Sequence, residues 1–170
     1  MNEAIVIHFR PELRDQIWGS IVHYRAGRTW VRDRIVGTIA LVAGLMVYSQ
    51  SGWRWWLAIL FAIGIAEWTD FLHAHTLRAW FSFARDPKFS EDYTLGFAPE
   101  GLHFKTATID SIIAWSHFDR AIEDSELFLL MTGRSMYSVI PRRAFAGENE
   151  VDRFRELIQQ MIPAYSRQNF

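Results

Sequence analysis

Three side chains that could coordinate a metal ion recur at three-residue spacing in the chain: Glu67, Asp70 and His73. On a helix this spacing places them along one stripe, and carboxylate oxygen with imidazole nitrogen suits zinc or manganese. Within residues 67–75, no Glu-x-x-His or His-x-x-x-His pattern occurs that would complete such a site. A polar edge at the end of an apolar helix explains the same residues, and we therefore predict no metal and no other cofactor.

A second chemical feature is the pair Arg142 and Arg143, which directly follows Pro141. A guanidinium presents a planar fork of donors that matches phosphate, so the pair is a candidate site for a ligand or a lipid headgroup. The acidic stretch over residues 119–126 offers an alternative, because ion pairs to it would occupy the same donors. The two arginines could equally fix the loop before the last helix.

The sequence does not favour an enzymatic function. It contains no cysteine, which excludes thiolate nucleophiles, disulfides and cysteine-based zinc sites. No Gly-x-Ser-x-Gly elbow and no glycine-rich phosphate loop occurs. With 18 Lys and Arg against 19 Asp and Glu, the chain also lacks the basic excess of a nucleic-acid-binding domain.

Residues 35–66 carry almost no charge and read as two apolar runs around a short polar turn. A helix needs about 20 mostly apolar residues to span a bilayer. We therefore expect a transmembrane helical hairpin that, with its cytosolic extension, covers residues 35–86. The alternative is a soluble hairpin buried in a larger core, but the rest of the chain is too small to cover two helices that are apolar all round.

Arginine and tryptophan flank this hairpin unevenly. Arginines cluster before the first run, and aromatic rings gather at the turn and at the opposite end, as at the two interfaces of a bilayer. The positive-inside rule then predicts an inner-membrane protein with both termini in the cytoplasm. The residues expected to position the hairpin at the interfaces are Arg25, Arg28, Arg32, Arg34, Trp53, Trp55, Trp56 and Trp68.

Small residues recur within the hairpin at the spacing of helix–helix contacts. Such residues let two backbones approach closely in lipid, where dispersion replaces the hydrophobic effect. They could serve the hairpin itself or contact a second copy of the chain, which would make the protein a structural homo-oligomer or a small pore. The residues concerned are Gly37, Ala40, Gly44, Ala62 and Ala66.

The remainder of the chain predicts a mixed domain. Residues 3–9 are β-branched and indicate a strand, and residues 11–34 read as an amphipathic helix with a break at Gly27. After Pro87 the pattern alternates, which predicts strands over 93–97, 102–106, 109–117, 119–124, 127–132 and 136–140. A closing helix over 150–162 would begin at an Asn149 N-cap and carry one apolar face, formed by Val151, Phe154, Leu157, Ile158 and Met161.

We therefore expect an α+β fold with three parts: residues 1–34, the hairpin over 35–86, and a cytosolic domain over 90–165. The domain has the outline of a pleckstrin-homology-like (PH-like) antiparallel half-barrel, closed by the C-terminal helix. The strand over residues 3–9 would join its sheet.

Several short motifs also carry a resemblance to a known family. They are Gly-Leu-His-Phe at 101–104, Ile-Ala-Trp at 113–115, the acidic turn at 123–126 and Ile-Pro-Arg-Arg-Ala-Phe at 140–145. Together they resemble the YcxB-like family of bacterial membrane proteins. The resemblance implies two membrane helices followed by a small β-rich domain, and it supplies no activity and no catalytic residue.

The expected function is that of a non-enzymatic binding or regulatory module held at the bacterial inner membrane. Its expected partners are the lipid bilayer, a protein or peptide, or a second copy of the chain, and not nucleic acid. The homo-oligomer or small pore is the main alternative. A membrane-interface metalloenzyme using Glu67, Asp70 and His73 is a further one.

Overall fold

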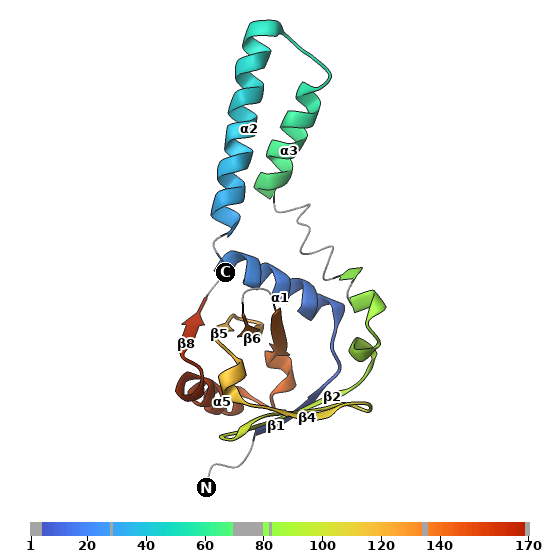
Figure 1. Ribbon diagram of the computed structural model, residues 1–170, viewed down its shortest axis with the longest axis vertical. Helices are drawn as coiled ribbons and strands as arrows, with labels where there is room; N and C mark the ends of the chain where they lie inside the picture. Colours follow the sequence, from blue (N-terminus) through green and yellow to red (C-terminus); the bar gives the residue numbers. More distant parts are fainter. Residues whose placement is uncertain (1–4, 28, 70–79, 82, 134–135, 169–170) are drawn as a thin grey trace. The chain divides into compact units, whose positions relative to one another are not determined.

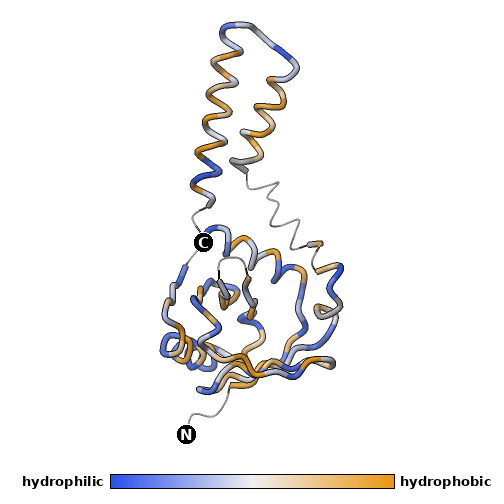
Figure 2. The backbone as a smooth tube through the Cα atoms, in the orientation of Figure 1, coloured by the Kyte–Doolittle hydropathy of each residue, from blue (hydrophilic) through white to orange (hydrophobic). Residues whose placement is uncertain are grey.

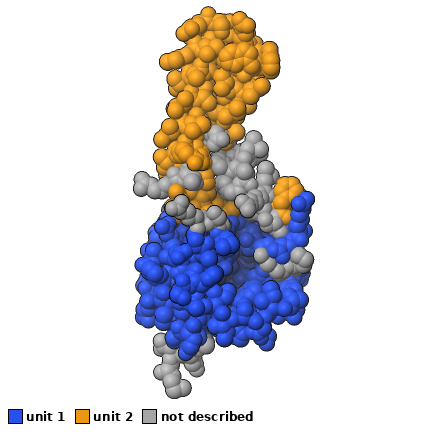
Figure 3. Space-filling model, viewed as in Figure 1, with its two compact units in different colours: residues 1–19, 82–170 blue, residues 20–81 orange. Residues whose placement is uncertain are grey.

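The computed structural model describes residues 5–27, 29–69, 80–81, 83–133 and 136–168. Its contacts divide the chain into two compact units, residues 1–19 with 82–170 and residues 20–81 (Figure 3). These boundaries differ from the expected ones at 34 and 86–90, because the N-terminal strand and the start of the following helix belong with the C-terminal part. The first unit is called the mixed unit below, and the second the helical unit.

One sheet of the mixed unit is antiparallel throughout and has the strand order β1-β2-β3-β4 (Figure 1). Its strands are β1 Ile5–Phe9, β2 Tyr93–Ala98, β3 Gly101–Lys105 and β4 Asp110–Ile113. The predicted addition of the N-terminal strand is confirmed, since β1 pairs with β2 and places Ile7 opposite Leu95. Strict alternation along β1 buries Ile5, Ile7 and Phe9, as a half-buried strand requires.

The other sheet has the order β7-β6-β5-β8. Its strands are β5 Arg120–Glu123, β6 Leu127–Thr132, β7 Met136–Pro141 and β8 Ala164–Arg167. β8 was not predicted, and it lies parallel to β5. The strand expected over residues 109–117 ends at Ile113, because the 3₁₀ turn η2 Trp115–His117 follows it.

Helix α5 Glu148–Met161 carries an apolar stripe into the core between these sheets. The Phe154 ring lies at its centre, with ring centroids 4.4 Å from Phe97 of β2 and 5.0 Å from Phe128 of β6. The predicted Asn149 N-cap is wrong: the helix begins at Glu148 with Gly147 as its N-cap, which leaves Asn149 inside the first turn. The stripe itself begins at Val151, as the spacing predicted.

The β2–β3 turn depends on glycine at its last position. Gly101 has φ 155°, and a Cβ there would lie 2.6 Å from the Ile113 carbonyl oxygen of β4. Any side chain at this position therefore strains the backbone and pushes β4 away from β3.

We expect Gly101→Ala to lower the free energy of unfolding by about 1–3 kcal/mol, the usual cost of a residue held in a disfavoured backbone conformation. Urea denaturation of the purified chain measures this loss. Gly96→Ala in β2 is the matched control, because the new Cβ would meet only the His103 Cβ at an ordinary 3.5 Å. Equal losses for the two variants would contradict the assignment.

Three helices precede the mixed unit's second strand: α1 Leu13–Ala26, α2 Thr29–Ser51 and α3 Leu57–Thr69. The predicted break near Gly27 is confirmed, since α1 ends at Ala26 and α2 begins at Thr29. α2 and α3 lie side by side as a hairpin and are largely apolar along their length (Figure 2). Judged by length and hydropathy together, none of the helices in the described ranges qualifies as a membrane span.

Candidate functional site

Glu123 at the end of β5 is the centre of a charged cluster that joins two sheet strands to α5. Its side chain is fully buried. Arg155 of α5 donates to both carboxylate oxygens, from Nε to Oε2 at 2.8 Å and from Nη2 to Oε1 at 2.6 Å. Tyr165 of β8 donates its hydroxyl to Oε2. The carboxylate therefore connects β5, β8 and α5 through charge-assisted hydrogen bonds.

The surroundings keep Glu123 ionised. Burial raises the pKa of its carboxyl. The hydrogen bonds from Arg155 and Tyr165 and the arginine charges lower that pKa by more, so that it lies below its ordinary value. Burial and then the bond to Glu123 raise the pKa of the Tyr165 hydroxyl. The hydrogen bond to Glu123 likewise raises the pKa of Arg155. A carboxylate that is ionised and saturated with donors suits a structural role and not proton transfer.

Arg142, one of the two arginines singled out by sequence, belongs to the edge of this cluster. Its Nη2 donates to Glu148 Oε2 at 2.6 Å, and its Nη1 lies 3.7 Å from Glu123 Oε1. Its side chain is only 19 % exposed. Both alternatives to ligand binding that the sequence offered are therefore present for Arg142. It forms an ion pair with Glu123 in the acidic stretch, and it binds Glu148 at the start of α5.

Arg143 points to a different set of acids, at the N-terminal end of α1. Its Nη2 donates to Asp15 Oδ2 at 2.6 Å and lies 3.0 Å from Glu12 Oε1. It also reaches the carbonyl oxygen of Arg10 at 3.2 Å. Glu12 and Asp15 were not predicted as partners, because no local sequence signal links positions 128 residues apart.

Both arginines nevertheless line an open cavity of about 450 Å³, which we call the charged pocket. It lies between the β5–β6 turn, the 3₁₀ turn η3 Arg142–Ala144 and the end of β8. Three guanidinium groups and two carboxylates therefore face one cavity. Its lining residues are Asp124, Ser125, Arg142, Arg143, Glu148 and Arg167.

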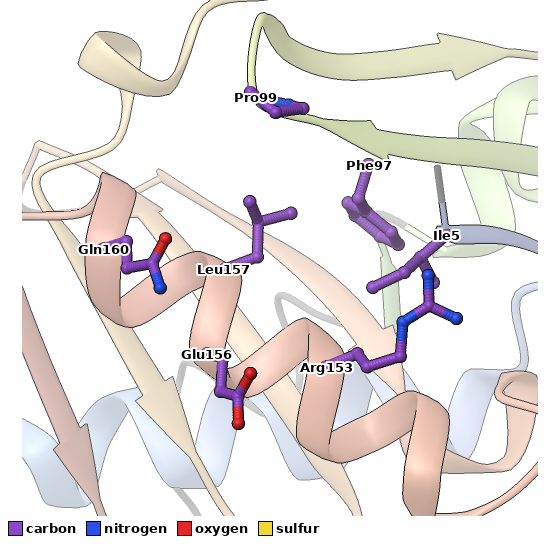
Figure 4. Close-up of a pocket in the computed structure, with 7 residues that line it drawn as sticks. All are labelled: Ile5, Phe97, Pro99, Arg153, Glu156, Leu157 and Gln160. Carbon is purple, nitrogen blue, oxygen red and sulfur yellow. The ribbon is translucent and has the colours of Figure 1, made fainter. Parts of the chain in front are cut away.

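A second, smaller cavity of about 110 Å³ lies between α5 and the β1–β2 side of the first sheet, and we call it the helix groove. Figure 4 shows Phe97 and Pro99 on one side and the side chains of α5 on the other. Its apolar wall is formed by Ile5, Phe97 and Leu157, whereas the polar groups come from α5. The lining residues are Ile5, Phe97, Pro99, Arg153, Glu156, Leu157 and Gln160.

In the helical unit, the predicted glycines lie at the contact between α2 and α3. Gly37 and Gly44 are buried, and a Cβ on Gly44 would lie 3.3 Å from the Phe61 ring. Gly64 of α3 lies so close to α2 that a Cβ would meet Leu41 at 2.6 Å. Ala40 and Ala66 are half-buried and Ala62 is exposed. The glycines thus serve packing within the hairpin.

The opposite sides of both hairpin helices expose apolar side chains to a degree unusual for a folded protein. Ile39 is 62 % exposed and Met46 is also 62 % exposed. Isolated exposed apolar residues are common, but contiguous apolar faces of this kind mark surfaces that are covered by lipid or by protein. Those of α2 and α3 are Val31, Ile35, Val36, Ile39, Val42, Leu45, Met46, Tyr48, Ile59, Ile63 and Ile65.

The predicted interface residues occupy varied places. Trp53 and Trp55 at the hairpin turn are 64 % and 76 % exposed, and Trp56 is half-buried. Arg34 stacks over the Trp30 ring at 5.0 Å, and Arg32 pairs with the neighbouring Asp33. Arg25 lies in the last turn of α1. Arg28 lies outside the described residues, and the side chain of Trp68 in α3 is likewise not described.

Two of the three candidate metal ligands, Asp70 and His73, lie outside the described residues, and Glu67 lies in α3 with its side chain undescribed. In the part of the chain that the structure describes, no three His, Asp or Glu side chains gather as a metal site would require.

Comparison with known proteins adds one match. The family model described as YcxB-like protein matches residues 97–158, from the end of β2 to the last turn of α5. This match confirms the resemblance carried by the motifs between Gly101 and Phe145. It includes Glu123, Arg142 and Arg155 but ends before β8. No curated protein and no solved structure matches the chain.

Proposed function

Because residues 97–158 form a YcxB-like domain, we propose that this protein is a non-enzymatic binding module anchored at the bacterial inner membrane by its helical hairpin. The mixed unit would bind an extended segment of a partner polypeptide, with an apolar side chain of that segment in the helix groove. The observation that carries the proposal is the groove itself, an apolar wall beside a sheet edge.

The edge strand β1 supplies the backbone part of such recognition. β1 pairs with β2 on one side, and no further strand of the described chain pairs with its other side. An antiparallel strand directs alternate N–H and C=O groups to each side, so β1 offers hydrogen bonds to an added strand. Ile5 belongs both to this edge and to the groove. A peptide lying along β1 therefore brings alternate side chains to the groove.

The chemistry of the groove selects the occupant. Its apolar wall accepts an aliphatic or aromatic side chain, and Arg153, Glu156 and Gln160 supply polar partners at its α5 side. A cavity of about 110 Å³ has room for a single side chain and not for a cofactor. The occupant would therefore be a peptide segment with one apolar anchor.

The membrane part of the proposal is supported by the exposed apolar faces of α2 and α3. In water these faces would be costly at about 25 cal/mol per Å² of apolar surface, whereas lipid removes the cost. The glycine contacts inside the hairpin hold the two helices together without using these outward faces. Membrane insertion and cytoplasmic termini remain predictions.

A photo-crosslinking amino acid in place of Gln160 tests the groove in intact cells. The neighbouring exposed Gln159 is a matched control of the same residue type that does not line the groove. We expect a discrete crosslinked product from position 160 and none from position 159. Equal products from both positions, or a product that contains only this chain, would contradict the binding of a foreign peptide.

Truncation of a side chain that lines the helix groove tests whether the groove holds the peptide's apolar anchor. We expect Leu157→Ala to weaken binding of the crosslinked partner's peptide about tenfold, the equivalent of 1.4 kcal/mol, because the pocket loses its wall. Met161→Ala is the control, since Met161 is also half-buried on α5 but lies outside the groove. Calorimetry on the purified chain measures both affinities. Equal weakening by the two variants would point to general loosening of α5.

A further inference from the structure

The charged pocket contains an acid that lacks part of its hydrogen bonding. Asp124 follows β5 and is 1 % exposed. Its Oδ2 accepts from Trp18 Nε1 at 2.7 Å, from Ser125 Oγ at 3.2 Å and from the Glu126 backbone N–H at 3.4 Å. Its Oδ1 is also buried, and no group in the described chain donates to it.

A buried carboxylate oxygen without a donor is costly, because it has given up water and gained nothing in return. Oδ1 has no surface open to water in this arrangement, so a donor in the charged pocket, which Asp124 lines, would reach it after a small rotation of the Asp124 side chain. The pocket also brings a second carboxylate, that of Glu148. Two carboxylates at one cavity favour a group with several N–H donors and a positive charge.

The arginines of the charged pocket indicate that the ligand also carries an anionic group. Arg142 and Arg143 already donate to Glu148 and Asp15. Arg167 differs, because its side chain is 57 % exposed and its Nε lies 3.9 Å from Glu123 Oε1, beyond hydrogen-bond length. Glu123 is meanwhile held by Arg155 and Tyr165. Arg167 therefore has donors available for an anion, and a guanidinium fork suits phosphate oxygens.

We infer that the charged pocket binds an aminoalkyl phosphate, a small zwitterion with a primary ammonium group and a phosphate joined by a short linker. The ammonium donates to Asp124 Oδ1 and lies near Glu148, and the phosphate accepts from Arg167. A purely anionic ligand would leave Asp124 Oδ1 without a donor and would be repelled by the Glu148 carboxylate. This inference does not rest on the helix groove or its peptide.

Titration of the full-length chain in a maltoside detergent with O-phosphoethanolamine tests the inference by calorimetry. Phosphocholine is the matched probe, because its methylated ammonium keeps the charge and the phosphate but has no N–H donor. We expect saturable binding of O-phosphoethanolamine and about tenfold or weaker binding of phosphocholine, the usual penalty for losing a hydrogen bond to a charged group. Absence of binding would mean that water alone satisfies Oδ1, and equal affinities would likewise overturn the inference.

Two variants locate the site. Asp124→Asn keeps an acceptor for Trp18 but removes the charge and places an amide donor where the ligand's ammonium would lie, so binding is expected to fall at least tenfold. Arg167→Gln is expected to weaken binding without affecting the fold, because the side chain is exposed. Arg120→Gln, an exposed arginine of β5 outside the pocket, is expected to bind as the unaltered chain does. Unchanged binding in the first two variants would overturn the assignment.

The same chemistry could come from a lipid headgroup or from a free metabolite. Vesicles of phosphatidylethanolamine and of phosphatidylcholine distinguish the two sources. A preference for the ethanolamine vesicles that disappears in Arg167→Gln identifies the headgroup as the ligand. Binding of free O-phosphoethanolamine with no preference between the vesicles identifies a soluble ligand. Both results support the pocket chemistry.

Discussion

Glu123→Gln is expected to lower the free energy of unfolding by about 3–5 kcal/mol, the usual cost of removing one partner of a buried ion pair. The amide cannot accept from both nitrogens of Arg155 and from Tyr165 as the carboxylate does. It would leave the positive charge of Arg155 in contact with an uncharged group. Because the cluster connects β5, β8 and α5, the loss should appear as cooperative unfolding of the mixed unit.

The same group makes stability depend on pH. Because the folded-state pKa of Glu123 lies below its ordinary value of 4.5, its contribution to stability is complete above that value. It is lost as the pH falls through the lower, folded-state pKa. Acid should therefore destabilise the unaltered chain more than Glu123→Gln, and the difference between them should narrow below pH 4.5.

Urea denaturation at pH 7 and at decreasing pH measures both effects. Glu156→Gln is the control, because Glu156 is an exposed carboxylate on the same helix as Arg155, and a surface substitution of this kind usually changes stability by less than about 0.5 kcal/mol. A difference between the two glutamate variants that stays constant with pH would show that Glu123 does not titrate as described.

The second large effect concerns the hairpin. Arginine in place of both Ile39 and Ile63, which are 62 % and 46 % exposed on α2 and α3, is expected to remove the chain from the membrane fraction. Each charge costs about 2.5–3.5 kcal/mol near the centre of a membrane helix. In a hairpin exposed to water the same substitutions would be harmless or would improve solubility.

Alkaline carbonate extraction of cell membranes followed by immunoblotting measures this partition. Ile112→Arg is the control, because Ile112 is 72 % exposed in the mixed unit and the membrane proposal assigns it no contact with lipid. We expect the control to stay in the carbonate-resistant pellet with the unaltered chain. An unaltered chain found in the supernatant would remove the membrane part of the proposed function.

Those parts of the fold that depend on local pattern could be predicted from the sequence. The short β-branched run over residues 3–9 indicated a strand, and the stripe of Val151, Phe154 and Ile158 indicated a buried helix face. The N-cap prediction failed because it rested on residue type alone. Asn149 is of a type preferred at N-caps, but the helix begins earlier, with Gly147 as its N-cap. β8 was missed because four residues, Ala164–Arg167, carry too little pattern.

The candidate sites were harder to predict because their residues meet only in the folded chain. Arg142 and Arg143 were found from their adjacency, but their partners were not. Glu123 meets Arg155 across 32 positions and Tyr165 across 42. The contact between Trp18 and Asp124 crosses 106 positions. No periodicity or local motif links residues so far apart, so the charged pocket required the structure.

The pairing of β1 with β2 has a consequence for synthesis on the ribosome. β1 is translated before its partner β2, and residues 20–81, which belong to the other unit, lie between them in the chain. At about 5–20 residues per second this interval lasts seconds. During that time the apolar side chains of Ile5, Ile7 and Phe9 have no sheet to join. The nascent chain must therefore keep an aggregation-prone strand apart from other chains until the later strands emerge.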